Sequence, residues 1–135
     1  MKKEKNVVVL LTGCVNPPRN AIYTTISNKD VRYQMYHKAI DFYITNCKYK
    51  KIVFCDNSNF KDFPDLEDKA KDNGVELELL AFKGDSEMVV KKGKGYGDGE
   101  IIEYALTNSK LIGSCEYFIK ISGRYIFDNI NKLFN

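Results

Sequence analysis

Residues 91–97, KKGKGYG, have the composition of a phosphate-binding segment, with three lysines and three glycines in a short run. Glycines allow positive φ angles and expose backbone amides to an anion, and lysines supply positive charge. A helix is expected to begin near Asp98, and its N-terminal amides would add to an anion site. The candidate phosphate contacts in this segment are Lys92, Lys94, Gly95, Tyr96 and Gly97.

The segment does not match the two common phosphate-binding motifs. The dinucleotide fingerprint needs a third glycine where this chain has Asp98 or Glu100, and the Walker pattern needs Lys-Ser/Thr after its last glycine. In the first turn of the expected helix, these two carboxylates would themselves satisfy the helix dipole. The pattern is therefore also typical of an exposed surface loop rich in glycine and lysine.

Composition limits the class of protein. The chain has 135 residues, which corresponds to one domain, and a net charge of +3 with no nucleic-acid-binding motif, so no nucleic-acid partner is predicted. Its four cysteines are far apart and accompanied by one histidine, which fits a reduced cytoplasmic protein better than a zinc site. The apolar run near the N-terminus is too short for a signal peptide or a transmembrane segment.

Strands and helices are expected to alternate along the chain. Runs of β-branched and aliphatic residues predict buried strands at residues 6–11, 51–55, 75–82 and 117–121. Helical spacing and capping residues predict helices at residues 28–46, 64–73 and 98–110, with a last turn at 130–134. This order predicts a doubly wound α/β fold with a mainly parallel sheet, Rossmann-like, in three α/β/α layers.

Polar residues follow three of these strands, at the edge where ligands bind in open α/β sheets. Asp56 is placed to accept hydrogen bonds from a ribose or base, although an Asx turn or a helix cap explains it equally well. Arg19 is as consistent with a solvated loop charge as with a ligand contact. The candidate contacts at this edge are Thr12, Gly13, Arg19, Asp56, Asn57, Ser122, Gly123 and Arg124.

The first helix carries two pairs of polar or aromatic residues that are one turn apart. Arg32 and Tyr36 are placed to brace the loop after the first strand. His37 and Asp41 lie on the polar side, where a surface pair is expected rather than a catalytic base. The expected buried face of this helix is Val31, Met35, Ala39 and Phe42, flanked by Tyr36, Ile40 and Tyr43.

The order of elements resembles the nucleotide-binding half of GT-A glycosyltransferases. GKGYGDGEIIEYALTNS followed by YFIKISGRY is similar to a helix and strand of that superfamily. The combination of GYGDGE, EYAL and KISGRY also resembles uncharacterised bacterial glycosyltransferase-like proteins of surface-polysaccharide loci. The resemblance implies transfer of a sugar from a nucleotide-sugar to a glycan or lipid-linked acceptor, in the cytoplasm or peripherally at the inner face of the membrane.

The chain departs from that family at the end of its last strand. The family typically has an Asp-x-Asp motif that holds a divalent metal there, and this chain has Ile-Ser-Gly-Arg-Tyr, so no metal cofactor is predicted. Arg124 and the lysines at 92 and 94 would then neutralise the diphosphate, and Asp56 would hold the ribose or base. Lys120 is another available cation, but strand alternation also fits a solvated residue, and Arg124 also fits a salt bridge.

A second departure is the lack of the segment that carries the family's acceptor site and catalytic base. Asp98 and Glu100 are the carboxylates left as candidates for a general base. Two alternatives remain open: a non-catalytic nucleotide-binding domain or truncated fragment, and a nucleotidyltransferase. The half-exposed third strand also offers an edge for self-association.

Overall fold

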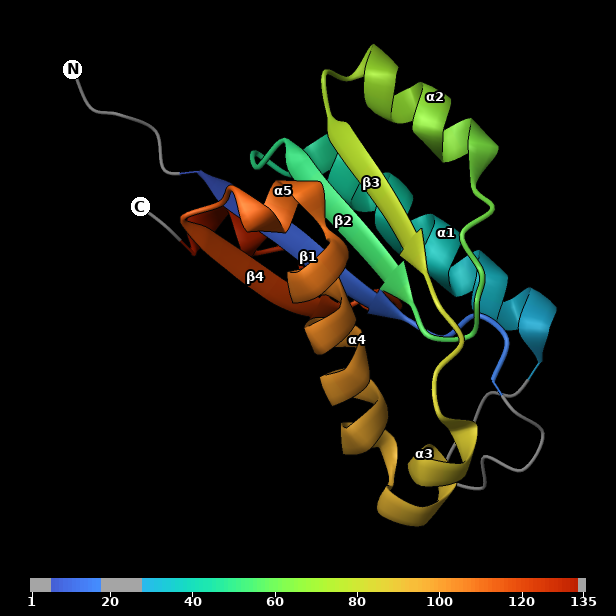
Figure 1. Ribbon diagram of the computed structural model, residues 1–135. Coiled ribbons are helices and arrows are strands. Elements are labelled where there is room, and N and C mark those ends of the chain that lie inside the picture. Colours follow the sequence, from blue (N-terminus) through green and yellow to red (C-terminus); the bar gives the residue numbers. More distant parts are fainter. Residues whose placement is uncertain (1–5, 18–27, 134–135) are drawn as a thin grey trace.

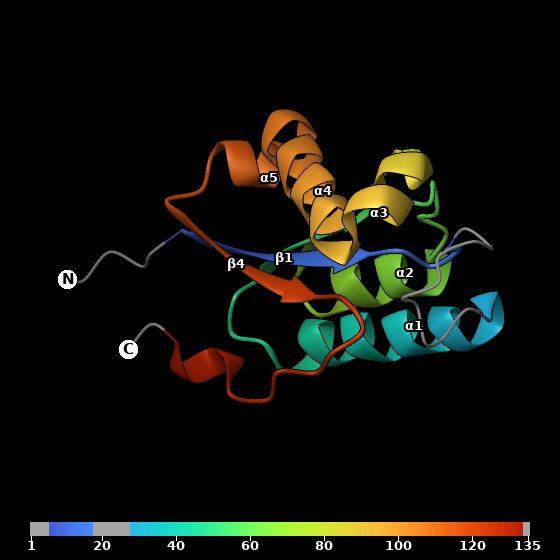
Figure 2. The ribbon, with the colours of Figure 1, turned by 90° about the horizontal axis from the view of Figure 1, so that it is seen from below.

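The structure is a computed structural model that describes residues 6–17 and 28–133 (Figure 1). It contains one four-stranded sheet in which every neighbouring pair of strands is parallel. Helices cover both faces of this sheet, so the predicted doubly wound α/β fold is confirmed (Figure 2).

The four predicted strands are all present, with ends that differ from the expected ones by at most two residues. They are β1 (Val7–Gly13), β2 (Lys51–Asp56), β3 (Glu76–Ala81) and β4 (Tyr117–Ser122), in the spatial order β3-β2-β1-β4. All residues of β1 are buried. The strand has a neighbour on each side and helices on both faces, which explains its unbroken apolar sequence.

The helices divide between the two faces of the sheet (Figure 2). On one face lie α1 (Lys29–Asn46) and α2 (Pro64–Asp72), together with a short 3₁₀ turn at Ile130–Lys132. On the other face lie α3 (Ser86–Lys92), α4 (Lys94–Asn108) and α5 (Lys110–Gly113). One apolar core fills each interface between helices and sheet.

The direction of the chain reverses between β1 and β4. From β1 the chain moves outward to β2 and β3 through α1 and α2, then crosses to the far side of β1 through α3, α4 and α5 to form β4. Thr12 pairs with Ser122, and the Gly123 amide donates to the Thr12 carbonyl at 2.7 Å. The carboxyl ends of β1 and β4 therefore form the topological switch point of the sheet, where ligands bind in open α/β folds.

Residues 91–97 are not the glycine-rich loop that was expected. α3 ends at Lys92, Gly93 forms the junction with a φ of 89°, and α4 begins at Lys94, before the expected start at Asp98. The prediction failed because each glycine costs a helix only about 1 kcal/mol relative to alanine. Burial of Ile101 and Ala105 against the sheet favours a continuous helix.

The buried face of α1 is rotated relative to the prediction. Arg32, Tyr36, Ile40 and Tyr43 are among its buried residues, whereas Val31 is 48% exposed. Tyr36 packs near two glycines at the ends of β1 and β4, which leave space for its ring. This close approach is a tertiary contact, so helical spacing alone did not reveal it.

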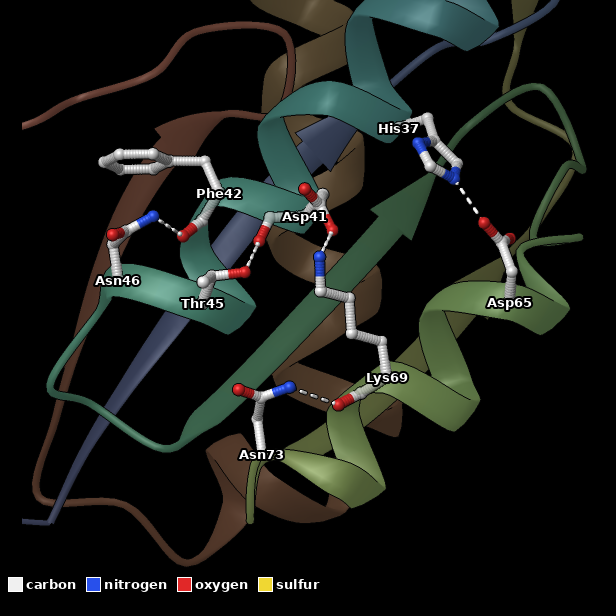
Figure 3. A network of polar contacts seen from close by, with 8 residues as sticks. All are labelled: His37, Asp41, Phe42, Thr45, Asn46, Asp65, Lys69 and Asn73. Carbon is white, nitrogen blue, oxygen red and sulfur yellow. Dashed lines mark hydrogen bonds and ion pairs between the residues drawn. The ribbon is translucent and has the colours of Figure 1, made fainter.

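His37 and Asp41 on α1 each pair with a residue of α2 and not with each other (Figure 3). His37 Nε2 lies 2.6 Å from Asp65 Oδ2, and Lys69 forms an ion pair with Asp41. The expected pair between His37 and Asp41 is therefore wrong. The prediction considered one helix, whereas α2 lies close enough to offer each residue a partner of opposite charge.

Candidate functional site

The loop after β1 is held by two residues of α1. The Cys14 amide donates to the Tyr36 hydroxyl oxygen at 2.8 Å, and Arg32 Nε donates to the Cys14 carbonyl at 2.7 Å. The Arg32 guanidinium also lies 3.4 Å from the Tyr36 hydroxyl. The prediction that Arg32 and Tyr36 brace this loop is confirmed, and both side chains are buried.

Gly13 and Gly123 are required by packing within the protein. A Cβ on Gly13 would lie 2.5 Å from the Phe54 ring, and a Cβ on Gly123 would lie 2.8 Å from the Thr12 carbonyl oxygen. The Tyr36 ring lies within 3.3 Å of both Cβ positions. Tyr36 therefore covers the ends of β1 and β4 on the α1 side, so a ligand has to approach from the carboxyl end of the strands or from the α4 side.

Two arginines and one buried aspartate set the electrostatics around Tyr36 and Cys14. Burial raises the pKa of Tyr36 to about 12, and the charges of Arg32 and Arg124 oppose the rise. Burial and the neighbouring Asp56 raise the pKa of the Cys14 thiol, while Arg32 lowers it. Cys14 is therefore held as the thiol, which is a poor nucleophile.

Arg124 lies two residues after the end of β4, and its side chain is half-buried. Its guanidinium lies 5.9 Å from the centre of the Tyr125 ring. It forms no ion pair with any carboxylate in the part of the chain that the structure describes. The alternative of a salt bridge therefore has no partner there, and the guanidinium is available to bind an anion.

Asp56 is fully occupied by its own protein. Its Oδ2 accepts from the Val15 amide at 2.8 Å, and its Oδ1 accepts from the Ser58 amide and hydroxyl, both at 2.6 Å, and from the Phe60 amide at 3.1 Å. The residue is completely buried. Burial raises the pKa of this carboxyl, while the hydrogen bonds oppose the rise. The geometry is that of an Asx turn that ties the loops after β1 and β2 together, which argues against contact with a ribose.

Asn57 contributes mainly its backbone to the same edge. Its amide donates to the Gly13 carbonyl at 3.0 Å, and its carbonyl accepts from the Gly84 amide at 2.8 Å. Its side-chain Oδ1 is buried and has no hydrogen-bond partner among the described residues. This oxygen is a polar atom of the site without a described partner, although sequence reasoning singled out Asn57 only as a neighbour of Asp56.

Among the remaining predicted cations and general bases, Lys120, Asp98 and Glu100 each bind another residue of the protein. Lys92 is exposed in the last turn of α3, while the side chain of Lys94 and the whole of Arg19 lie outside the described residues. Lys120 pairs with Asp98 at 3.4 Å. Both carboxylate oxygens of Glu100 accept from the Asp85 amide at 3.2 Å.

Lys120 pairs with Asp98, near the start of α4, through its long side chain. The Cys55 Sγ lies 3.9 Å from the Ile101 carbonyl oxygen, so Ile101 is level with the carboxyl ends of the strands, and the start of α4 at Lys94 lies beyond them (Figure 1). The first turn of α4 includes Gly95, has no acidic residue and has no side-chain cap. Its unpaired amides therefore remain able to bind an anion.

No group of three or more His, Cys, Asp or Glu side chains within residues 6–17 and 28–133 is arranged to hold a metal ion. A shallow, open hollow of about 490 Å³ lies away from the switch point, between the loop after β2, α2 and β3. It is lined by Asn59, Phe60, Lys61, Asp62, Glu67 and Leu79. None of the sequence-predicted site residues lines it.

Comparison of the chain with protein-family models, curated proteins and solved structures finds no significant match. Helices in the described ranges are all too short or too polar to cross a bilayer. Functional inference therefore rests on the geometry of the switch point.

Proposed function

We propose that this chain binds the diphosphate of a nucleotide-sugar at the carboxyl ends of β1 and β4, as the donor site of a glycosyltransferase. The observation that carries the proposal is the position of Arg124. Arg124 is two residues beyond the end of β4, next to the topological switch point of the sheet, and its guanidinium has no ion-pair partner among the described carboxylates.

The chemistry of sugar transfer requires such a cation. When the bond from the sugar to its diphosphate breaks, negative charge accumulates on the departing phosphate oxygens. A guanidinium can bind two of these oxygens through parallel N–H donors. In our proposal Arg124 supplies this charge.

The remaining predicted contacts take modified roles. Thr12 and Ser122 offer hydroxyls at the paired ends of β1 and β4. Asn57 replaces Asp56 as the candidate for recognition of the ribose or base, because its buried oxygen has no described partner. The proposed acceptor is a glycan or a lipid-linked sugar at the inner face of the membrane.

The test is a thermal-shift titration with UDP, GDP, CMP and ADP and their sugar conjugates, each with manganese or with EDTA. A ligand that binds only the folded state raises the melting temperature; at 100 times its Kd the stabilisation is about 2.7 kcal/mol. We expect one nucleotide series to shift the transition in EDTA. Arg124→Ala is expected to weaken that ligand about 10- to 100-fold, because a hydrogen bond to a charged group contributes about 1.5–3 kcal/mol.

Two further variants control this titration. Arg124→Lys retains the positive charge but lacks the paired N–H donors of a guanidinium, so it is expected to bind with intermediate affinity. Lys132→Ala removes an exposed cation of the 3₁₀ turn and is expected to bind like the wild type. A shift that requires manganese would refute the role of Arg124 as the substitute for a metal. No shift with any nucleotide would refute the donor site itself.

A second candidate function is nucleotide binding without catalysis. It is favoured by the engagement of the two candidate bases, since Asp98 pairs with Lys120 and Glu100 binds the Asp85 amide. Release of nucleoside diphosphate from the bound sugar conjugate, measured with mixed glycan acceptors, distinguishes the two. Binding with turnover supports the transferase, and binding without turnover supports the non-catalytic domain.

A further inference from the structure

Three of the helices, α1, α2 and α4, end at or beside an asparagine whose side chain binds the helix itself. The Nδ2 groups of Asn46, Asn73 and Asn108 donate to the carbonyl oxygens four residues earlier, at 3.1, 2.8 and 3.0 Å. Figure 3 shows the first two of these contacts, at the ends of α1 and α2. The three asparagines therefore share one local arrangement, and they differ in the residue that follows each of them.

Only Asn73 is followed by a glycine, and Asn73-Gly74 is the one Asn-Gly pair in the sequence. Both residues are exposed, and nothing lies within 4 Å of the position that a Cβ on Gly74 would occupy. Because glycine has no side chain, its backbone nitrogen can approach the side-chain carbonyl carbon of the preceding asparagine closely. This pair has the composition and the open surroundings that attack of a backbone nitrogen on a side-chain amide requires.

The Asn73-Gly74 pair forms part of the turn that ends α2. The Gly74 amide donates to the Lys71 carbonyl at 3.2 Å, and Gly74 has a φ of 69°. The Val75 amide donates to the Ala70 carbonyl at 2.8 Å, which completes a Schellman motif. One long hydrogen bond at an exposed helix end therefore holds the Gly74 nitrogen, and such ends open at a free-energy cost near zero.

The amides that follow the other two asparagines are held inside the protein. The Cys47 amide donates to the Tyr43 carbonyl at 3.1 Å, and Cys47 is 1% exposed. The Ser109 amide donates to the Ala105 carbonyl at 2.8 Å, and Ser109 is 6% exposed. The Ser109 hydroxyl also caps α5. Opening of either helix end would expose part of the core or release α5, so neither amide is free to react.

We propose that Asn73 is a site of spontaneous deamidation in the folded protein. Hydroxide removes the proton from the Gly74 nitrogen, and this nitrogen attacks Cγ of Asn73. The bond from Cγ to Nδ2 breaks, and Nδ2 leaves as ammonia with a proton from water, which regenerates hydroxide. The product is a five-membered succinimide ring. Water opens this ring at the bond from Cγ to nitrogen to give aspartate, or at the bond from the backbone carbonyl carbon to nitrogen to give isoaspartate.

Both products weaken the junction between α2 and β3. An aspartate at position 73 cannot donate to the Lys69 carbonyl, and it places a negative charge at the negative end of the helix dipole. Isoaspartate also lengthens the backbone by one carbon atom just before Val75, which is buried in the same core as Ala70. The Glu76 amide donates to the Lys50 carbonyl at 2.8 Å, so the chain is fixed again directly after Val75. The isoaspartate form should therefore be the less stable of the two.

The modification site lies at the opposite edge of the sheet from the proposed donor site. β3 starts at Glu76, which pairs with Lys51 at the start of β2, whereas the switch point lies at the carboxyl ends of the strands. The deamidation does not depend on the proposed function, and the two inferences can fail separately.

The first experiment follows deamidation of the wild type by peptide mapping. The folded protein and the protein in concentrated urea are incubated side by side in mildly alkaline buffer. Mass spectrometry locates each replacement of NH₂ by OH, and isoaspartyl methyltransferase labels the isoaspartate. We expect Asn73 of the folded protein to react within about 10-fold of its rate in urea, because the helix end opens locally. A reaction that needed global unfolding would be at least about 1,000-fold slower in the folded protein.

Asn46 and Asn108 are the internal controls, because their side chains make the same contact with the preceding helical turn. We expect them to remain unmodified in the folded protein, and we expect the rate at Asn73 to rise in proportion to the hydroxide concentration. The proposal would be overturned if Asn73 reacted in urea and not in the folded protein. Equal reaction at Asn73 and Asn108 of the folded protein would overturn it as well.

The second experiment measures the effect of the modification on stability. Ion exchange separates aged chains, which carry one additional negative charge, from unmodified chains. Asn73→Asp supplies the aspartate form with a normal backbone, and Asn73→Gln removes the site, because its longer side chain forms the corresponding ring more slowly. We expect Asn73→Asp to melt below the wild type and the isoaspartate fraction to melt lower still. Equal melting temperatures of aged and unmodified protein would contradict the weakened junction.

Discussion

At the scale of single residues, Tyr36 connects more of the site than any of the predicted ligand contacts. Its hydroxyl binds the Cys14 amide, and its ring packs against the Cβ directions of Gly13 and Gly123. One side chain thereby holds the loop after β1 and the turn after β4 in a fixed relation. The two glycines at this edge therefore leave space for the Tyr36 ring, a role that sequence motifs for ligand-binding glycines did not predict.

Replacement of Tyr36 by Phe is expected to lower the free energy of unfolding by about 1–3 kcal/mol. The ring and its packing remain, but the part-buried Cys14 amide loses its acceptor, and such an unsatisfied donor carries a desolvation penalty of this size. Urea denaturation measures the loss. Tyr33→Phe is the matched control, because Tyr33 stacks on Phe63 at 5.3 Å through its ring, and it should change stability little. Equal losses in the two variants would contradict the role given to the Tyr36 hydroxyl.

The same hydroxyl predicts a decline of stability in alkali. The pKa of Tyr36 is raised from 10.0 to about 12, mainly by burial. Above its ordinary pKa the unfolded chain releases this proton while the folded chain retains it, so stability falls as pH rises from 10.0 toward about 12. The difference in stability between wild type and Tyr36→Phe should therefore shrink across this range. Denaturant titrations at stepped alkaline pH values test it, and a constant difference would contradict it.

At the scale of secondary structure elements, replacing a glycine should have opposite effects in the turn after β4 and inside α4. Gly123→Ala is expected to destabilise the protein by about 1–3 kcal/mol, because the added methyl would meet the backbone oxygen of Thr12 and one of the two must move. Gly99→Ala lies inside α4 with open space around the new methyl, and it should stabilise the protein by about 0.5–1 kcal/mol. Thermal melts of both variants measure whether each substitution lowers or raises the stability. Destabilisation by Gly99→Ala would contradict the assignment of this segment as helix.

The contact between α1 and α2 is expected to weaken in acid. The pKa of Asp65 is lowered, chiefly by its hydrogen bond with His37. Its stabilisation is therefore present above the ordinary carboxyl pKa of 3.8 and is lost as pH falls through the lower folded-state value. Because the Asp65 side chain is largely exposed and that of His37 is partly exposed, the coupling should be only about 0.2–1 kcal/mol.

A double-mutant cycle with His37→Ala and Asp65→Asn isolates this coupling from the interaction of Asp65 with the N-terminus of α2. We expect a measurable coupling at about pH 6 that declines as pH falls below the ordinary carboxyl pKa of 3.8. A coupling that is unchanged in acid would show that the ion pair does not form in solution.

At the scale of the whole molecule, the sheet order predicts a gradient of local stability. β1 is buried along its length and has a strand on each side, as has β2, whereas β3 and β4 are edge strands. Amide hydrogens of β1 and β2 should therefore exchange last, with an opening free energy close to that of global unfolding. Amide hydrogens of α3 should be among the first to exchange. Hydrogen exchange followed by mass spectrometry tests this order.

The sequence by itself determined the elements whose signals are local. Unbroken apolar runs identified the strands, Asn28 caps α1 as expected, and Pro64 and Gly74 bound α2. Arg32 and Tyr36 could be assigned to the β1 loop because one helical turn separates them, and the order of elements was enough to infer the doubly wound fold.

Only the tertiary structure decided the features that depend on residues distant in the chain. The engagement of Asp56 by Val15, the helical state of residues 94–97 and the partners of His37 and Asp41 each follow from contacts between elements. Local propensities for these residues are small, about 1 kcal/mol or less, and packing and hydrogen bonding across elements exceed them. For the same reason, it was the register of β4 against β1 that brought Arg124 to the switch point.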